Sequence, residues 1–313
     1  MGVFPPLEDI RPMHLTKHHV FGNDFLVRLE PDEAPCPPGW VRGTCDRTRG
    51  IGADGIMWAR AHGDAAGSGA GSSEDPLRAE MRLYNADGGE AEVSGNGLAC
   101  LAQALTLRAG RDEAEVLIDT AAGERRVSIG SSRFADADDA GAAFGRIRSR
   151  AGIDLGRASE DDDQTGRAGE ILADLAPAVS RVGWVSIGNP HVVVLLDSVH
   201  HLEELVLEPV GSTLQERLHP VNFEAVAVVD RSLVRMRVFE RGVGITSACG
   251  SGAAAVAWRL HRWGLVEQTV QVEMPGGTAE VRVGSGVELH APVIYVADVE
   301  APEPALPDAG GTS

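Results

Sequence analysis

The chain has 313 residues, of which 43% are hydrophobic and only 4% aromatic, and its formal net charge at pH 7 is −18. This length predicts about two domains, and the negative charge argues against nucleic acid as a partner because phosphate groups would be repelled. The sequence shows no signal segment, no lipidation motif and no apolar run long enough to cross a bilayer, so we expect no membrane partner and a cytoplasmic location.

Lysine occurs only once, at Lys17, and the other 27 basic residues are arginines. A pyridoxal phosphate enzyme needs a lysine for its Schiff base, and Lys17 lies in a strand-like segment, so we expect any amino-acid chemistry to need no cofactor. His14 and His18 have an i, i+4 spacing but no carboxylate or cysteine nearby, and no metal site is predicted. Four cysteines show neither a C-x-x-C pair nor a disulfide spacing: Cys36, Cys45, Cys100 and Cys249.

In the first half of the chain, short apolar runs predict strands at 13–29 (a pair joined by the turn 22–24), 45–58 (entered through a glycine-rich turn), 81–85, 116–118 and 126–129. Loops are predicted where proline, glycine or small residues gather, at 1–12, 31–38 and 61–75, the last of which reads as disordered.

In the second half, strands are predicted at 184–197, 219–230, 234–240, 270–274, 279–283 and 293–296. The acidic stretches 136–143 and 159–166 read as loops, and the tail from 301 as disordered.

Two stretches 155 residues apart repeat each other: S-G-N-G-L-A-C at 94–100 and C-G-S-G-A-A-A at 249–255. In each, a potentially nucleophilic side chain precedes two glycines, and an Ala/Leu/Val-rich run predicts a helix. The start of a helix carries partial positive charge, so it can hold a ligand carboxylate and lower the pKa of an adjacent thiol.

The repeat extends upstream, because Asn85 precedes Ser94 by nine residues and Glu240 precedes Cys249 by the same interval, each at the end of an alternating apolar segment. A duplicated strand, glycine-rich turn and helix predict two similar halves that face each other across one ligand. We expect an α+β fold with mostly antiparallel sheets wrapped on one prominent helix per half. The predicted halves are 1–121, completed by a strand at about 291–300, and 122–290, followed by the tail 301–313.

Eight motifs occur in the order seen in the diaminopimelate epimerase family, which the chain resembles over about residues 13–298. They are G-N-D-F at 22–25, C-D-R-x-x-G-I-G-A-D-G at 45–55, N-A-D-G at 85–88, S-G-N-G at 94–97, G-N-P-H at 188–191, V-N-F-E at 221–224, E-R-G-V-G at 240–244 and A-C-G-S-G at 248–252.

The resemblance implies a cofactor-independent epimerase that interconverts L,L- and meso-diaminopimelate for lysine and peptidoglycan synthesis, often as a homodimer. It also implies two pseudo-symmetric domains, each a curled, mostly antiparallel sheet around a central helix. The family moves the Cα proton with two cysteines, one on each face of the substrate. Carried over by motif, the second is Cys249, whereas the first falls on Ser94.

Ser94 leaves three explanations open: weakened or altered epimerase chemistry, a paralogue with another reaction, or an engineered substitution. A serine alkoxide forms far less readily than a thiolate, so the general-acid step should suffer. Cys100 does not replace the missing thiol, because it lies about 9 Å further along the predicted helix and on another face; it reads as a core residue.

A ligand with two zwitterionic ends needs donors for its carboxylates and acceptors for its ammonium groups. Backbone N–H groups at the two helix starts suit the reacting carboxylate: Gly95, Asn96, Gly250 and Ser251. Arg241, with Asn85 and Asn222, suits the distal carboxylate. The candidates for the ammonium groups are Asn23, Asn189 and Glu240.

Two further positions bear on the site. His191 is equally consistent with a structural histidine and with second-shell support of the site. Ile245 stands where the family commonly has glutamate, which alters the surroundings of Cys249.

The leading hypothesis is therefore a diaminopimelate epimerase with catalytic Cys249 and Ser94. Two alternatives remain. One is an amino-acid lyase, dehydratase or racemase of another amino acid with Cys249 as its single strong base, because hydroxyproline dehydratases among the proline racemase-like relatives carry a hydroxyl residue in place of one cysteine. The other is a non-catalytic amino-acid-binding paralogue.

Overall fold

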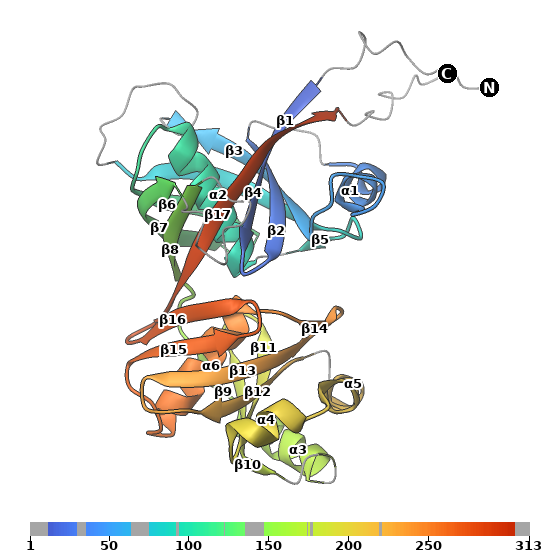
Figure 1. Cartoon of the computed structure of the whole chain (residues 1–313), viewed down its shortest axis with the longest axis vertical. Coiled ribbons are helices and arrows are strands. Elements are labelled where there is room, and N and C mark those ends of the chain that lie inside the picture. Colours follow the sequence, from blue (N-terminus) through green and yellow to red (C-terminus); the bar gives the residue numbers. More distant parts are fainter. Residues whose placement is uncertain are drawn as a thin grey trace, which may run out of the picture. The chain divides into compact units, whose positions relative to one another are not determined.

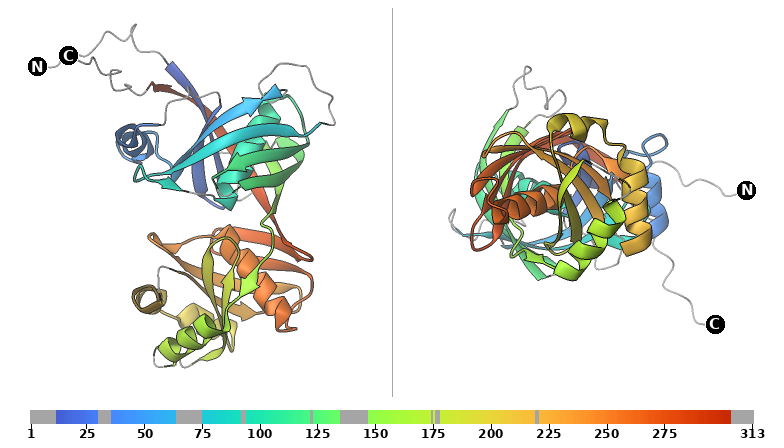
Figure 2. Two further views of the ribbon diagram at one scale, coloured as in Figure 1. Left: turned by 180° about the vertical axis from the view of Figure 1, so that it is seen from behind. Right: turned by 90° about the horizontal axis from the view of Figure 1, so that it is seen from below.

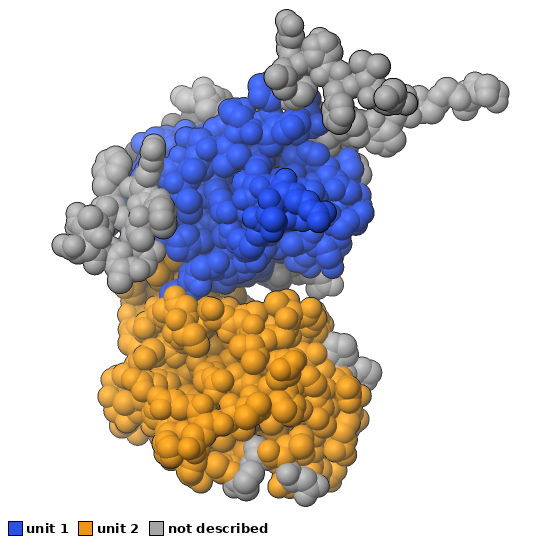
Figure 3. Space-filling view, turned by 45° about the vertical axis from the view of Figure 1, so that its right-hand side comes forward, with its two compact units in different colours: residues 1–149, 293–313 blue, residues 150–292 orange. Residues whose placement is uncertain are grey.

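The computed structural model describes residues 12–29, 36–63, 75–91, 94–121, 123–134, 147–173, 175, 178–218 and 221–303. The predicted loop 136–143 lies outside these ranges. The predicted loops 1–12 and 61–75 also lie outside them, apart from residues 12, 61–63 and 75. The chain divides into two compact units (Figure 3): unit 1 comprises residues 1–149 and 293–313, and unit 2 comprises residues 150–292.

Unit 1 is a curled sheet with one central helix (Figure 1). Its elements are β1 (Pro12–Val20), β2 (Asn23–Leu29), α1 (Pro38–Cys45), β3 (Gly55–His62), β4 (Leu77–Asn85), β5 (Glu90–Ala91), α2 (Gly95–Arg108), β6 (Ala114–Thr120), β7 (Gly123–Phe134), the start of β8 (Ile147–Asp154) and most of β17 (Val287–Pro302). Strand β1 pairs with β17 and β2, β2 runs parallel to β3, β3 pairs with β4, and β4 pairs with β5 and runs parallel to β6, which pairs with β7.

Unit 2 repeats this topology strand by strand. Its elements are β9 (Ser159–Glu160), α3 (Asp162–Leu172), β10 (Val179–Ser186), β11 (Pro190–Leu196), α4 (Val199–Glu204), α5 (Leu207–Leu218), β12 (Asn222–Val228), β13 (Leu233–Glu240), β14 (Gly244–Thr246), α6 (Gly250–Arg262), β15 (Thr269–Met274) and β16 (Gly277–Val283). The hairpin β10–β11, the parallel pair β11–β12, the antiparallel pairs β12–β13 and β13–β14, the parallel pair β13–β15 and the hairpin β15–β16 follow the order of unit 1. The predicted fold class, α+β with two pseudo-symmetric, mostly antiparallel halves, is confirmed.

The helices α2 and α6 lie inside their sheets (Figure 2). Every residue of α2 from Asn96 to Thr106 is buried, and α2 packs against six strands of its own unit. A helix that is apolar on all sides belongs in a core rather than at a surface. Small residues keep α6 narrow, since 253–255 is a run of three fully buried alanines.

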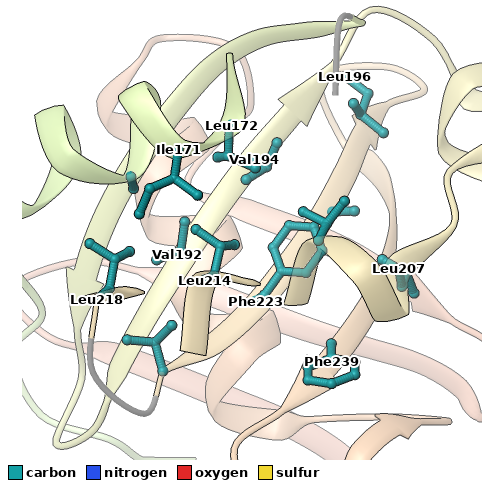
Figure 4. Close-up of a cluster of buried hydrophobic side chains, with 14 of the residues drawn as sticks. Ile171, Leu172, Val192, Val194, Leu196, Leu207, Leu214, Leu218, Phe223 and Phe239 are labelled. Carbon is teal, nitrogen blue, oxygen red and sulfur yellow. The ribbon is translucent and has the colours of Figure 1, made fainter. Parts of the chain in front are cut away.

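Unit 2 has a second core on the outer face of its sheet, where α3 and α5 cover β11 and β12 (Figure 4). Phe223, Val192 and Leu214 are fully buried there. Alternate residues of β11 point to opposite faces, and both faces are covered, which explains why the strand reads as a continuous apolar run instead of an alternating one.

Several predicted boundaries were wrong. Residues 159–166 are not a loop: Asp161 caps α3 by accepting an N–H from Gln164 at 3.0 Å, and Asp162 and Asp163 lie in its first turn, where carboxylates are stabilised by the helix dipole. Helices α1, α4 and α5 were also missed. Strand β17 includes Ala301 and Pro302, which were predicted to be disordered.

The division between the units also differs from the predicted boundary after residue 121, because β7 pairs along its length with β6 and so belongs to unit 1. No helix in the described part of the chain is long and apolar enough to cross a membrane.

Candidate active site

The central helix of each unit begins at a residue that can carry a transferable proton. Ser94 and Cys249 are the N-caps of α2 and α6, with backbone angles of φ −134°, ψ 124° and φ −134°, ψ 113°. Ser94 Oγ accepts the N–H of Gly97 at 3.2 Å, and Cys249 Sγ accepts that of Gly252 at 3.4 Å. The hydroxyl and the thiol therefore occupy equivalent places at the positive ends of two helices.

The first intrahelical bonds are donated by Leu98 to Ser94 O at 2.8 Å and by Ala253 to Cys249 O at 2.9 Å. In each helix the cap accepts the N–H of the third residue. The N–H groups of the first two residues have no acceptor within the helix. They are those predicted from the sequence: Gly95 and Asn96 in α2, and Gly250 and Ser251 in α6. Such a pair of N–H groups can bind a carboxylate or the oxyanion formed from it.

In unit 1, Asn23 is fixed at both ends of its amide. Its Nδ2 donates to Asp54 Oδ2 at 2.8 Å, and its Oδ1 accepts from Asn96 Nδ2 at 3.0 Å. The structure thus brings Asn23 and Asn96 together beside Ser94, and Asp54 holds the asparagine from behind.

An ion-pair cluster supports this arrangement. Arg47 contacts Asp24 at 2.6 Å and Asp54 at 2.7 Å, and Lys17 contacts Asp24 at 2.8 Å. Burial opposes ionisation of Asp24, but the bonds from Arg47 and Lys17 outweigh it and keep the pKa of Asp24 below its usual value. The cluster fixes the start of β2, where Asn23 lies.

In unit 2, a chain of polar side chains leads away from Cys249. Its Sγ lies 3.5 Å from Ser251 Oγ, which accepts from Asn189 Nδ2 at 3.4 Å. Asn189 Oδ1 lies 3.0 Å from His191 Nε2, and His191 Nδ1 lies 2.6 Å from Glu224 Oε1. The structure therefore brings four residues singled out from the sequence into one network, and adds Glu224.

Glu240 is the carboxylate next to Cys249. Burial raises the pKa of Glu240, partly offset by hydrogen bonds from Thr246, at 2.5 Å, and Cys249. Burial, and then the charges of Glu240 and Glu224, raise the pKa of Cys249 well above its usual value despite the contacts to Ser251 and Gly252. These surroundings favour the protonated thiol of Cys249 over its thiolate.

Glu240→Gln is expected to increase the rate at which iodoacetamide alkylates Cys249 at pH 8 about three- to tenfold. A raised pKa keeps the thiol protonated up to higher pH, so loss of the carboxylate shifts thiolate formation to lower pH. The rate at the Cys249 peptide is followed by mass spectrometry between pH 7 and 10. Glu203→Gln, which removes an exposed carboxylate on α4, serves as the control, and identical profiles for both variants would contradict the electrostatic link.

The residues predicted for the distal carboxylate lie at the ends of strands or just beyond them. Asn85 ends β4, is exposed, and pairs in register with Gly55. Asn222 begins β12, and its Oδ1 accepts the N–H of Arg241 at 2.9 Å, which fixes the turn after β13. The Arg241 side chain is exposed.

Five residues of these networks were not assigned from the sequence: Asp24, Arg47, Asp54, Glu224 and Thr246. All but Thr246 stand in the motifs at 22–25, 45–55 and 221–224, so the signal was present, but their contacts depend on pairing between strands. Ile245 is 57% exposed. All four cysteines are free, and the described residues contain no group of three or more side chains suited to hold a metal ion.

Comparisons with known proteins match most of the chain. The family model described as diaminopimelate epimerase matches residues 15–136 and 183–290. A diaminopimelate epimerase from Synechocystis sp. is 34% identical over 279 residues, covering 86% of this chain and 90% of that protein. One from Xylella fastidiosa is 34% identical over 317 residues, covering 95% and 98%.

Solved structures share the fold at lower identity. A predicted epimerase from Pseudomonas aeruginosa has a TM-score of 0.64 at 18% identity, covering 92% of this chain and 99% of that one. A PhzF-family phenazine biosynthesis protein from Bacillus anthracis has a TM-score of 0.63 at 16% identity, covering 93% and 99%. The matches in sequence extend over most of the chain, and they show that this protein is an isomerase of the epimerase type that belongs to the diaminopimelate epimerase family.

Proposed function

We propose that the protein interconverts L,L- and meso-diaminopimelate without a cofactor, by moving the Cα proton from one face of the carbon to the other. The observation that carries the proposal is the pair of equivalent helix starts, one capped by the thiol of Cys249 and the other by the hydroxyl of Ser94. The names of the relatives supply the substrate. The reaction requires both half-sites to act on one substrate molecule.

Cys249 is the stronger of the two acid–base groups. A substrate ammonium group beside Glu240 would offset the carboxylate charge that raises the pKa of Cys249, so substrate binding itself favours the thiolate. The thiolate then takes the Cα proton, and the electron pair left on carbon is delocalised into the substrate carboxylate. The N–H groups at the start of a central helix stabilise the resulting oxyanion.

Ser94 completes the reaction from the other face. Its hydroxyl, or a water that it holds, returns a proton to Cα and recovers one from solvent. In the reverse direction the hydroxyl is a poor base, because its alkoxide is far less accessible than a thiolate. The same transition state is crossed in both directions, so the enzyme is expected to be slow in both.

Substrate recognition is assigned to the remaining residues. Arg241, Asn85 and Asn222 bind the distal carboxylate, with the planar guanidinium giving two parallel hydrogen bonds, and Asn23 and Glu240 accept from ammonium groups. Lys17, the single lysine, is held by Asp24 and by Gly52 O at 2.6 Å. We also propose a cytoplasmic location and a homodimer, as in the family.

Incubation of L,L-diaminopimelate with the protein in D₂O is expected to give meso product that carries deuterium at the inverted carbon. Chiral chromatography and mass spectrometry measure inversion and exchange separately. Inversion with deuterium supports the two-sided transfer. Exchange without inversion would leave Cys249 as a working base with no partner and contradict the role of Ser94, and no exchange would contradict the proposed substrate.

Ser94 is also the observation that favours a second candidate, a lyase with Cys249 as its only strong base. After the proton is taken, a substrate with a β-hydroxyl can eliminate water instead of being reprotonated. Release of a keto acid or a cyclic imine from hydroxylated amino acids, with no inversion, would establish this reading.

A further inference from the structure

Two polar side chains lie on the inner face of the unit 2 sheet, which packs on α6. The outward positions of β11 and β12 form the outer core with α3 and α5, so the alternate positions face α6. His191 and Glu224 occupy two of these inward positions, and both are 0% exposed. The next inward residues along the two strands, Val193 and Val226, are apolar. A Cβ on Gly252 would lie 2.7 Å from Glu224 Oε1, so the second glycine of G-S-G makes room for this carboxylate.

The contacts of His191 determine where protons lie. Asn189 Oδ1 is only an acceptor, so His191 Nε2 must donate to it across 3.0 Å. The 2.6 Å hydrogen bond between Nδ1 and Glu224 Oε1 fixes the ring from its other side. The titratable neighbours are Glu240 and Cys249.

The corresponding positions of unit 1 show what this pair replaces. Register pairs Phe25 with Gly55 in β2–β3 and His191 with Asn222 in β11–β12. Phe25 therefore corresponds to His191, and Met57, two residues after Gly55, corresponds to Glu224. In unit 1 a carboxylate contacts the asparagine without a histidine between them, because Asp54 accepts directly from Asn23 Nδ2.

The two asparagines therefore present opposite ends of their amides to the start of the central helix in their own unit. Asn23 gives its NH₂ to Asp54, which leaves its oxygen on the side of Asn96. Asn189 gives its oxygen to His191, which leaves its NH₂ on the side of Ser251 and Cys249. The sequence had suggested that Asn189 accepts from an ammonium group; one lone pair of its oxygen is used by the His191 ring, and the NH₂ is the end that lies beside Ser251.

We infer that Glu224 is a positioning residue: through the Nε2–H of His191 it fixes the amide of Asn189 so that Asn189 donates to a substrate carboxylate. This inference rests on the proposed function for the identity of the ligand, whereas the hydrogen bonds that join Glu224, His191 and Asn189 do not depend on it. The second oxygen of Glu224 is buried without a protein partner in the described structure, so a glutamine can place its carbonyl there and donate its NH₂ to Nδ1.

The test compares three variants. Glu224→Gln is expected to keep KM for L,L-diaminopimelate within about threefold, whereas Glu224→Met should raise it about 10- to 100-fold, the effect of losing a hydrogen bond to a charged group. The double variant His191→Phe, Glu224→Met installs the residues of unit 1. It should unfold at a temperature close to that of the parent, because an apolar pair can replace a buried polar pair without loss of stability, yet keep the high KM. A purely structural role predicts instead that the double variant regains the parental KM.

A second readout does not depend on activity. In ¹⁵N-histidine-labelled protein, the His191 signals are those that are missing from the double variant. Near pH 7.5, His191 should carry a proton on Nε2 in the parent and in Glu224→Gln. This preference for Nε2 should be lost in Glu224→Met. An unprotonated Nε2 in the parent, or parental KM in the double variant, would overturn the inference. If the parent neither binds nor turns over diaminopimelate, the proposed substrate fails, while the ring spectrum still decides the role of Glu224.

Discussion

Cys249→Ala is expected to lower the rate of Cα proton exchange on L,L-diaminopimelate about 10³-fold or more. A general acid or base contributes about 10²–10⁴ to such a rate, and alanine has no group that can exchange a proton. The Ser94 hydroxyl cannot take over, because it is the weaker base. Deuterium incorporation from D₂O, followed by mass spectrometry over hours, measures the residual rate.

The same substitution removes the N-cap of α6, because Cys249 Sγ accepts the N–H of Gly252. Loss of this sulfur cap should lower the free energy of unfolding by less than the ~1 kcal/mol typical of a lost serine or asparagine cap, and urea titration can measure the difference. Cys36→Ala is the matched control: the Cys36 side chain is 2% exposed against 6% for Cys249, but it lies in the core next to α1. This control should exchange deuterium at the parental rate. Equal rates for the two alanine variants would remove Cys249 from the mechanism.

The sequence predicted the starts of the two central helices better than it predicted the elements around them. The spacing of Asn85 to Ser94 and of Glu240 to Cys249 identified the end of a strand and the start of a helix in both units, because glycines and a capping side chain are local signals. The caps and the N–H groups with no acceptor in their helix lie where those signals indicated, whereas the contacts that join Cys249, Ser251, Asn189 and His191 were not predicted.

The elements that were missed depend on tertiary contacts. Helix α5 carries Gly211 and β-branched residues and has weak local preference for a helix, but Leu207, Leu214 and Leu218 bury one face against β12. Most helical stability comes from such packing. The role of Glu224 was unreadable for a related reason: the parallel register of β11 and β12 brings it to His191, 33 residues away in sequence.

Ser94→Cys is expected to raise the rate of epimerisation about 10²-fold or more. The new thiol would accept the N–H of Gly97 at the start of α2, in the place where Cys249 accepts that of Gly252. A thiol has an unperturbed pKa of about 8.5. The carboxylates that raise the pKa of Cys249, Glu240 and Glu224, are matched in unit 1 by Asn85 and Met57, and a helix N-terminus lowers the pKa of a thiol. The first half-site would therefore gain both a usable base and a better acid. The gain in kcat/KM should be the same in both directions, because the ratio of the two values is fixed by the equilibrium constant of the reaction.

The stability of this variant should change in the opposite direction. Serine is a preferred N-cap and cysteine is not, so Ser94→Cys should lower the free energy of unfolding by about 0.5–1 kcal/mol. Ser94→Ala is the control, since it loses both cap and hydroxyl and should be less stable and slower than the parent. Inversion of L,L-diaminopimelate is measured for all three proteins by chiral chromatography.

A Ser94→Cys protein no faster than its parent would mean that Ser94 does not stand in for a catalytic thiol. The unequal half-sites give that outcome a specific meaning. Unit 2 joins Cys249 to a buried histidine and carboxylate, whereas unit 1 has Phe25 and Met57 at the matching positions. If a thiol at residue 94 stayed inactive, the reaction would use proton transfer on the Cys249 side alone, as a lyase does. If the thiol restored fast inversion, the absence of a thiol at residue 94 would account for the slow reaction of the parent.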